Sequence, residues 1–206
     1  MKSGFCLTRL AFAVVMAMLL PGCLFKRSTV PVRHFVLSPI STNEPPLAST
    51  EHLSVGIGLV KMPSYLLRNS LAVRNGANEI EYLESAQWGE RLDQCFQRTV
   101  AANLSRLLSS DNVYSTEWAR NQVLLRVLIN VQQFEVDTKG HGTLVAHWRI
   151  TAPETDTPLK SGTARLDRTG NSPHGNPGAI AVTLSDLTLA FSRDLAQSIR
   201  ESAKRR

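Results

Sequence analysis

The sequence contains little cysteine. Its 206 residues include three cysteines, Cys6, Cys23 and Cys95. If Cys6 leaves with a cleaved signal and Cys23 is modified, as argued below, Cys95 has no partner for an intrachain disulfide. A disulfide-stapled fold is therefore excluded. Cys95 stands beside Phe96 in a helical pattern, so we expect a buried small hydrophobic residue rather than a nucleophile.

Motifs of enzymes and metal sites are lacking as well. The chain has no G-x-S-x-G nucleophile elbow, no G-x-x-x-x-G-K-[ST] phosphate loop and no H-x-x-x-H pair with a neighbouring acid. Glu79, Glu81 and Glu84 alternate in an extended segment, where they would face solvent. We therefore expect no catalytic residue, no metal and no cofactor. A hydrolase whose triad assembles from distant positions stays open as an alternative.

The apolar run near the start is too short to span a membrane. It covers Leu10–Leu20, 11 residues, where a span needs about 20. Lys2 and Arg9 precede it without any acid, and small Gly22 stands directly before Cys23. A basic region, an apolar region and a small-residue cleavage site predict a signal peptide over residues 1–22. Leu20-Pro21-Gly22-Cys23 is similar to a bacterial lipobox, which predicts lipidation of Cys23.

The predicted modification is a diacylglyceryl thioether on Cys23, with a further acyl chain such as palmitate on its nitrogen. Each buried methylene contributes roughly 0.8 kcal/mol and one chain anchors only marginally, so a stable anchor needs two or more chains. An ordinary secreted protein with an incidental cysteine is the alternative. Residue 24 is Leu. In the lipoproteins that this chain resembles, Asp at that position favours the inner membrane, so we expect the periplasmic face of the outer membrane in a Gram-negative envelope.

Charge of either sign is scarce. Removal of residues 1–22, which carry Lys2 and Arg9 and no acid, lowers the formal net charge from +6 to +4. That is short of the clustered Lys/Arg footprint of a nucleic-acid binder, so we expect no nucleic-acid partner. The remaining 184 residues suffice for one domain with its own core. We divide them into a lipidated tether over 23–32 and a single domain over 33–206.

Hydrophobic periodicity predicts two helices and a sheet. Apolar residues recur every three or four positions in a helix that begins at Ser85 or Gln87 and ends near Leu108, and again over Pro177–Ser202. Alternating segments predict strands over 33–37, 53–60, 123–136 and 144–150, another through Ala164 and Leu166, and a hairpin of 71–74 with 79–83. We expect an α+β fold with a mostly antiparallel sheet and both helices packed on one face as a two-layer sandwich.

The stretch Lys61–Leu92 exceeds what a strand connection requires: Met62, Tyr65 and Arg68 lie near its one proline, Pro63, and Trp88 stands near the start of the expected helix. These residue types are enriched at protein interfaces. We therefore name candidate partner-binding residues: Met62, Pro63, Tyr65, Leu66, Arg68 and Trp88. The alternative is a bulged strand end that is closed by an aromatic plug.

Several short motifs carry a family resemblance. They are Phe35-Val36-Leu37-Ser38-Pro39, the run from Val55 to Arg68, Val73-Arg74, Ile80-Glu81-Tyr82, Trp88-Gly89-Glu90-Arg91-Leu92 and Asn103-Leu104, after a lipobox cysteine. Together they span nearly the whole mature chain. The chain resembles the ABC-type transport auxiliary lipoproteins of the PqiC type.

This resemblance implies a non-catalytic component of an envelope lipid-transport system. It implies partnership with an MCE-domain protein that spans the periplasm and with its integral-membrane partner. The lipoprotein would act as a docking or assembly partner at the outer membrane, as a monomer or a homo-oligomer. A structural envelope lipoprotein that binds cell-wall polymer is the alternative function.

Overall fold

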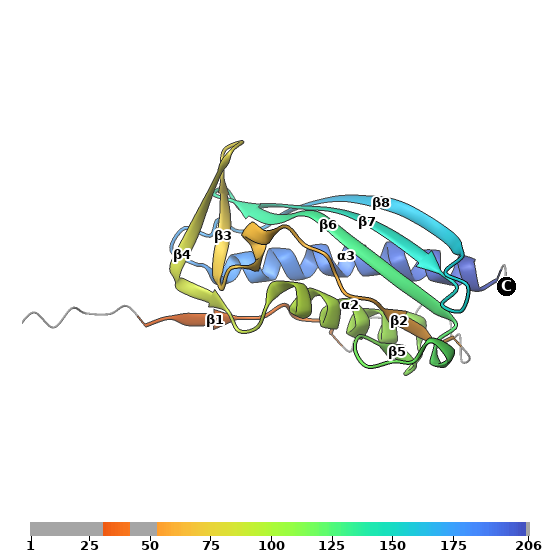
Figure 1. Cartoon of the computed structure of the whole chain (residues 1–206). Coiled ribbons are helices and arrows are strands. Elements are labelled where there is room, and N and C mark those ends of the chain that lie inside the picture. The colour runs from red at the N-terminus through yellow and green to blue at the C-terminus, as the bar shows by residue number, and fades with distance from the viewer. Residues whose placement is uncertain (1–30, 42–52, 205–206) are drawn as a thin grey trace, which may run out of the picture. The chain divides into compact units, whose positions relative to one another are not determined.

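The computed structural model describes residues 31–41 and 53–204 (Figure 1). Residues Val32–Arg206 make up one compact unit. Its elements in chain order are β1 (Arg33–Phe35), β2 (Val55–Ile57), η2 (Ser64–Leu67), β3 (Ser70–Asn75), β4 (Glu79–Trp88), α2 (Leu92–Leu108), β5 (Val113–Tyr114), η3 (Arg120–Gln122), β6 (Leu125–Asp137), β7 (His141–Thr151), β8 (Pro158–Thr169) and α3 (Gly178–Ala203).

Strand β6 organises the sheet. One edge of β6 pairs antiparallel with β7, which pairs antiparallel with β8. The other edge is shared: β2 pairs parallel with the first half of β6, at Val55–Leu125, and β3 pairs parallel with its end, at Val73–Val136. Strand β5 lies beside β2, β4 beside β3 and β1 beside β4. The sheet therefore branches at one edge of its longest strand.

The predicted α+β fold class is confirmed, but the expected mostly antiparallel sheet is wrong, because the sheet is mixed. The β1–β4, β2–β5, β2–β6 and β3–β6 pairs are parallel. The antiparallel pairs join strands that follow one another through short turns, β3–β4, β6–β7 and β7–β8. Those turns are visible in the sequence, whereas the parallel pairs join segments far apart along the chain.

Buried residues of the sheet and of both helices form one hydrophobic core; the packing of both helices on one face as a two-layer sandwich stays a prediction. Alternate β6 residues Leu125, Val127, Ile129 and Val131 are buried, as the period-2 pattern predicts. Helix α3 runs along β6, β7 and β8 on that side and also contacts α2 (Figure 1). The ring of Phe96 in α2 packs edge-on against Phe134 at 5.1 Å and lies 5.9 Å from Phe191 in α3. Each such buried side chain contributes about 1.5–3 kcal/mol to stability, so these rings join both helices to β6.

Helix α2 begins later than the sequence pattern predicts. Strand β4 continues to Trp88, and the helix begins at Leu92 rather than at Ser85 or Gln87. Ala86 and Trp88 are buried while their neighbours are not, which is the alternation of a strand. The same residues pair with β1, at Ala86–Arg33 and Trp88–Phe35. The end of α2 is as expected: Ser109 has φ 50 and caps the helix with a left-handed residue.

The predicted signal peptide over 1–22 and the lipidation site Cys23 lie outside the described residues, so both stay predictions. Among residues 31–41 and 53–204, no helix has the length and apolar character needed to cross a bilayer. The division of the chain at residues 22 and 32 also stays a prediction.

Candidate functional site

After β2 the chain continues beside β6 and carries the candidate partner-binding residues with it. Lys61 pairs with Asn130, and its backbone donates to the Ile129 carbonyl at 3.0 Å and accepts from the Val131 amide at 2.8 Å. Pro63 then ends this pairing, since it has no N–H to donate. The short helix η2 follows and lies over the last part of β6.

A buried carboxylate fixes η2 to the sheet. Glu135 of β6 is 2% exposed and accepts the Tyr65 hydroxyl at 2.7 Å, Arg74 Nε at 2.7 Å and Gln133 Nε2 at 2.9 Å. A buried charge is tolerated where an opposite charge and hydrogen bonds compensate it. Glu135 has both, so these four residues form a satisfied polar network.

Burial raises the pKa of the Tyr65 hydroxyl far above its ordinary value near 10, and its hydrogen bond to the Glu135 carboxylate raises the pKa further. An ionised phenol beside Glu135 would place two negative charges in contact, so the neutral form is favoured. Tyr65 therefore acts as a hydrogen-bond donor in a structural contact.

A second contact holds η2 against the β3–β4 hairpin. The Tyr82 hydroxyl donates to the Tyr65 carbonyl at 3.1 Å. The Arg68 guanidinium lies over the Tyr82 ring, 4.6 Å from its centroid, which is cation–π geometry. Arg68 is exposed, so this contact presents a cation at a fixed place on the surface.

The candidate partner-binding residues do not all reach the surface. Leu66 is 3% exposed and Trp88 is 6% exposed, and both belong to the core. Met62 and Tyr65 are half-buried and pack against that core. Pro63 is half-buried and Arg68 is exposed. The structure thus brings Met62, Pro63, Tyr65 and Arg68 to one surface segment, whereas Leu66 and Trp88 support it from inside. Partner binding by this set stays a prediction.

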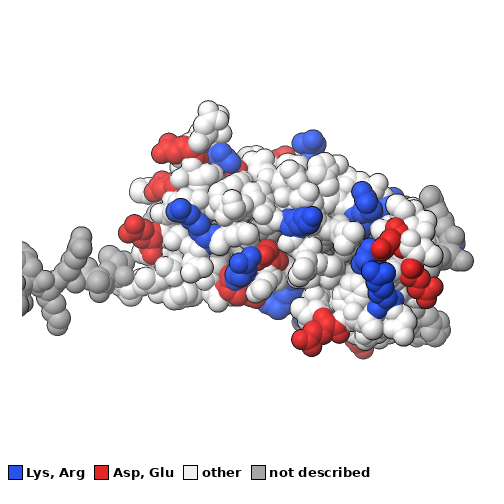
Figure 2. Space-filling view, in the orientation of Figure 1, with Lys and Arg blue, Asp and Glu red and all other residues white. Residues whose placement is uncertain are grey.

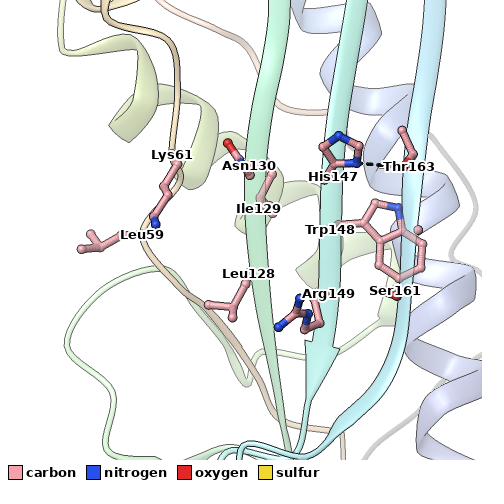
Figure 3. Close-up of a pocket in the computed structure, with 11 residues that line it drawn as sticks. Leu59, Lys61, Leu128, Ile129, Asn130, His147, Trp148, Arg149, Ser161 and Thr163 are labelled. Carbon is pink, nitrogen blue, oxygen red and sulfur yellow. Dashed lines mark hydrogen bonds between the residues drawn. The ribbon is translucent and has the colours of Figure 1, made fainter.

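Sequence reasoning missed a cavity of about 670 Å³ on the other face of the sheet from α3 (Figure 3). We call it the outer groove. Its floor consists of residues that alternate with the buried ones on β6, β7 and β8. Cross-strand register sets Asn130 beside His147 and Leu128 beside Arg149. Lys61 and Leu59 close its side.

An irregular pairing exposes Leu59 at the groove. Ile57 pairs with Val127 and Lys61 with Asn130, so β6 has one residue fewer than the chain beside it. An extra residue in a bulge is pushed out of the ladder. Leu59 is 85% exposed, while Val60 is 7% exposed. The Gly56-x-Gly58 spacing hints at such irregular backbone, but it does not say which side chain is exposed.

Two features bear on catalytic chemistry, namely metal-binding clusters and the thiol of Cys95. Among the described residues, no group of three or more His, Cys, Asp and Glu side chains could hold a metal ion. Cys95 is fully buried, as expected, and burial raises the pKa of its thiol to about 11. At neutral pH this thiol is protonated and shielded, which is unlike an activated nucleophile.

Comparison with known proteins places this fold. A family model described as "ABC-type transport auxiliary lipoprotein component" matches residues 35–196. The chain belongs to this family. This match confirms the family resemblance that the sequence motifs indicated. The chain is an auxiliary lipoprotein of the ABC-type transport family. No curated protein matches it.

Two solved structures are similar to this chain. Protein XCC0632 from Xanthomonas campestris is 13% identical with a TM-score of 0.65, and the match covers 84% of this chain and 97% of that one. A crystal structure of an uncharacterised protein is 17% identical with a TM-score of 0.67, covering 82% of this chain and 99% of that one. At these identities the likeness supports the fold alone.

Proposed function

We propose that this auxiliary lipoprotein is a non-catalytic component of an envelope lipid-transport system. It is anchored through acyl chains on Cys23 to the periplasmic face of the outer membrane. There it docks an MCE-domain protein that spans the periplasm together with its integral-membrane partner. The family match over residues 35–196 carries this proposal. The lipobox-like Gly22-Cys23 junction supports the anchor.

The surface segment of Met62, Pro63, Tyr65 and Arg68 is the proposed docking surface. Binding costs less when the surface is already ordered. Here the Tyr65–Glu135 hydrogen bond and the Arg68–Tyr82 contact order the segment before a partner arrives. Arg68 would be the principal contact, because arginine is enriched among the few residues that carry most of the binding energy of an interface.

Affinity purification from the native host tests this proposal. Full-length, lipidated protein with a C-terminal tag should co-purify with an MCE-domain protein. Arg68→Ala should reduce the recovered partner about tenfold, within the range for an interfacial arginine. Arg120→Ala is the matched control, because Arg120 is also exposed but lies in η3.

Three results would count against the proposal. Equal loss of the co-purified partner in Arg68→Ala and Arg120→Ala would show that the segment around Arg68 is not the docking surface. If no MCE-domain protein is recovered from wild-type membranes, the proposed partner is wrong. Binding to purified peptidoglycan without any protein partner would favour a structural envelope lipoprotein instead.

A further inference from the structure

The outer groove contains two cations that have no carboxylate partner among the described residues. Lys61 and Arg149 are exposed, and neither forms an ion pair within residues 31–41 and 53–204. None of the described residues that line the groove is acidic. Arg126, on the same face of β6, is by contrast paired with Asp156. Figure 2 shows basic and acidic side chains interspersed over the visible face, several of them side by side.

Two leucine side chains lie beside the two cations. In Figure 3 the side chain of Leu128 lies between those of Lys61 and Arg149, with Leu59 beside Lys61. Leu59 is 85% exposed. Gly58 leaves room for Leu128, because a Cβ at position 58 would come within 2.9 Å of Leu128 Cδ2. The groove therefore offers positive charge and hydrocarbon contact side by side.

Hydrogen-bonding side chains line the floor of the groove. His147 Nδ1 and Thr163 Oγ1 are 2.8 Å apart, and Ser161 lies opposite Arg149 on β8. The Asn130 side chain lies in the same row as His147 and is exposed. These hydroxyl, amide and imidazole groups can bind the polar atoms of a headgroup beside the charged one.

We propose that the outer groove binds the headgroup of an anionic phospholipid. Lys61 and Arg149 would hold the phosphate, since arginine matches phosphate geometry bidentately and lysine adds a compact charge. Leu59 and Leu128 would contact the first methylenes of the acyl chains. The volume of about 670 Å³ lies within the range of small-ligand sites, about 300–1,000 Å³. It suits a headgroup and glycerol rather than whole chains.

This inference deepens the proposed function and rests on it for biological sense, but its test requires no transport partner. A failure to bind lipid would therefore leave the proposed docking role intact. Loss of docking would likewise leave lipid binding intact.

Vesicle co-flotation provides the measurement. The mature chain 23–206 with Cys23→Ser differs from the native protein only at the anchor sulfur and cannot associate through its own acyl chains. It should float with phosphatidylglycerol vesicles and not with phosphatidylcholine vesicles. Lys61→Gln/Arg149→Gln should weaken binding about 30-fold, because each basic residue near an anionic membrane surface contributes about fivefold.

The matched control is Arg120→Gln/Lys139→Gln, which removes the same charge from two other exposed positions. It should change binding less than threefold. Circular dichroism melting curves of both double variants should overlay the parent curve. Equal loss of vesicle binding in both double variants would show non-specific electrostatic attraction to the membrane and would overturn the proposed site.

A third arm separates a lipid from a free phosphate compound. Leu59→Asn, which removes the apolar contact without adding charge, should weaken vesicle binding severalfold, and soluble glycerol phosphate at millimolar concentration should not compete. Competition by glycerol phosphate, together with an unchanged Leu59→Asn variant, would identify a small-phosphate site and overturn the lipid assignment.

Discussion

Charged side chains at the two ends of one face of β6 differ in burial and in ion pairing. Near its end, Glu135 is 2% exposed and is held by Arg74, Tyr65 and Gln133. In its first half, the same face meets Lys61 and Arg149, which are exposed and have no ion-pair partner among the described residues. A buried charge without a partner is costly, so the chain itself must supply the partners of Glu135. Exposed cations contribute little to stability, so Lys61 and Arg149 in the outer groove are available to bind a ligand.

This contrast predicts that mutations separate into those that affect stability and those that affect binding. The largest expected effect on stability is that of Arg74→Ala, which leaves the Glu135 carboxylate buried without its opposite charge. The free energy of unfolding should fall by about 3 kcal/mol, the lower end of the cost of breaking a buried pair. Urea unfolding measures this. A loss below about 1 kcal/mol would show that the buried Glu135 carboxylate does not depend on Arg74.

Two leucines in neighbouring segments give a matched pair. Leu66 is 3% exposed and Leu59 is 85% exposed. Leu66→Ala should lower the free energy of unfolding by about 2.5 kcal/mol, because it opens a cavity in the core. Leu59→Ala should change it by less than about 0.5 kcal/mol, as is usual for a surface substitution. If the two variants unfold at the same urea concentration, the assignment of η2 to the core is wrong.

Tyr65→Phe removes one hydroxyl from the network. Since that hydroxyl donates to a charged acceptor at 2.7 Å, its loss should cost about 2 kcal/mol. Thermal melting of the variant beside wild type checks this. Retained partner binding at temperatures where both proteins are folded would confirm that the hydroxyl supports the surface rather than forming it.

The same tyrosine predicts a difference at alkaline pH. Its pKa is raised in the folded chain, so its contribution is fully present below the ordinary pKa near 10 and is lost as pH rises above it. The gap in free energy of unfolding between wild type and Tyr65→Phe should therefore narrow above about pH 10. A gap that stays constant through pH 11 would contradict the raised pKa.

The smallest effects on stability belong to the outer groove. Lys61→Ala and Arg149→Ala should each change the free energy of unfolding by less than about 0.5 kcal/mol. Chemical denaturation in low salt provides the check, since salt screens exposed charges. A larger loss would indicate that these cations stabilise the fold, which would weaken the contrast between the two regions.

Local patterns in the sequence predict much of this fold. The alternation of Leu125, Val127 and Ile129 indicates β6, and the helical stripe through Leu187, Phe191 and Leu195 indicates α3 within one residue of its ends. The burial of Cys95 also follows from such a pattern. These features depend on residues close together along the chain, where side-chain period alone decides which face is buried.

Features that depend on distant pairing were not predictable in this way. The extension of β4 to Trp88 requires β1 as a partner, and the parallel pairs that make the sheet mixed join segments far apart. The outer groove combines residues of three strands with Leu59, whose exposure follows from the bulge beside β6. For the docking surface, composition identified the segment, but it could not show that Leu66 and Trp88 face the core.

Site-specific photocrosslinking in the native host tests the central claim most directly. A photoreactive residue in place of Arg68, in full-length protein with Cys23 intact, should form an adduct with an MCE-domain protein. The adduct should be lost when Cys23 is replaced by alanine, and it should be absent when the photoreactive residue replaces Arg120. An adduct of equal yield from both positions, or none from position 68, would contradict the proposal that this surface docks a transport partner.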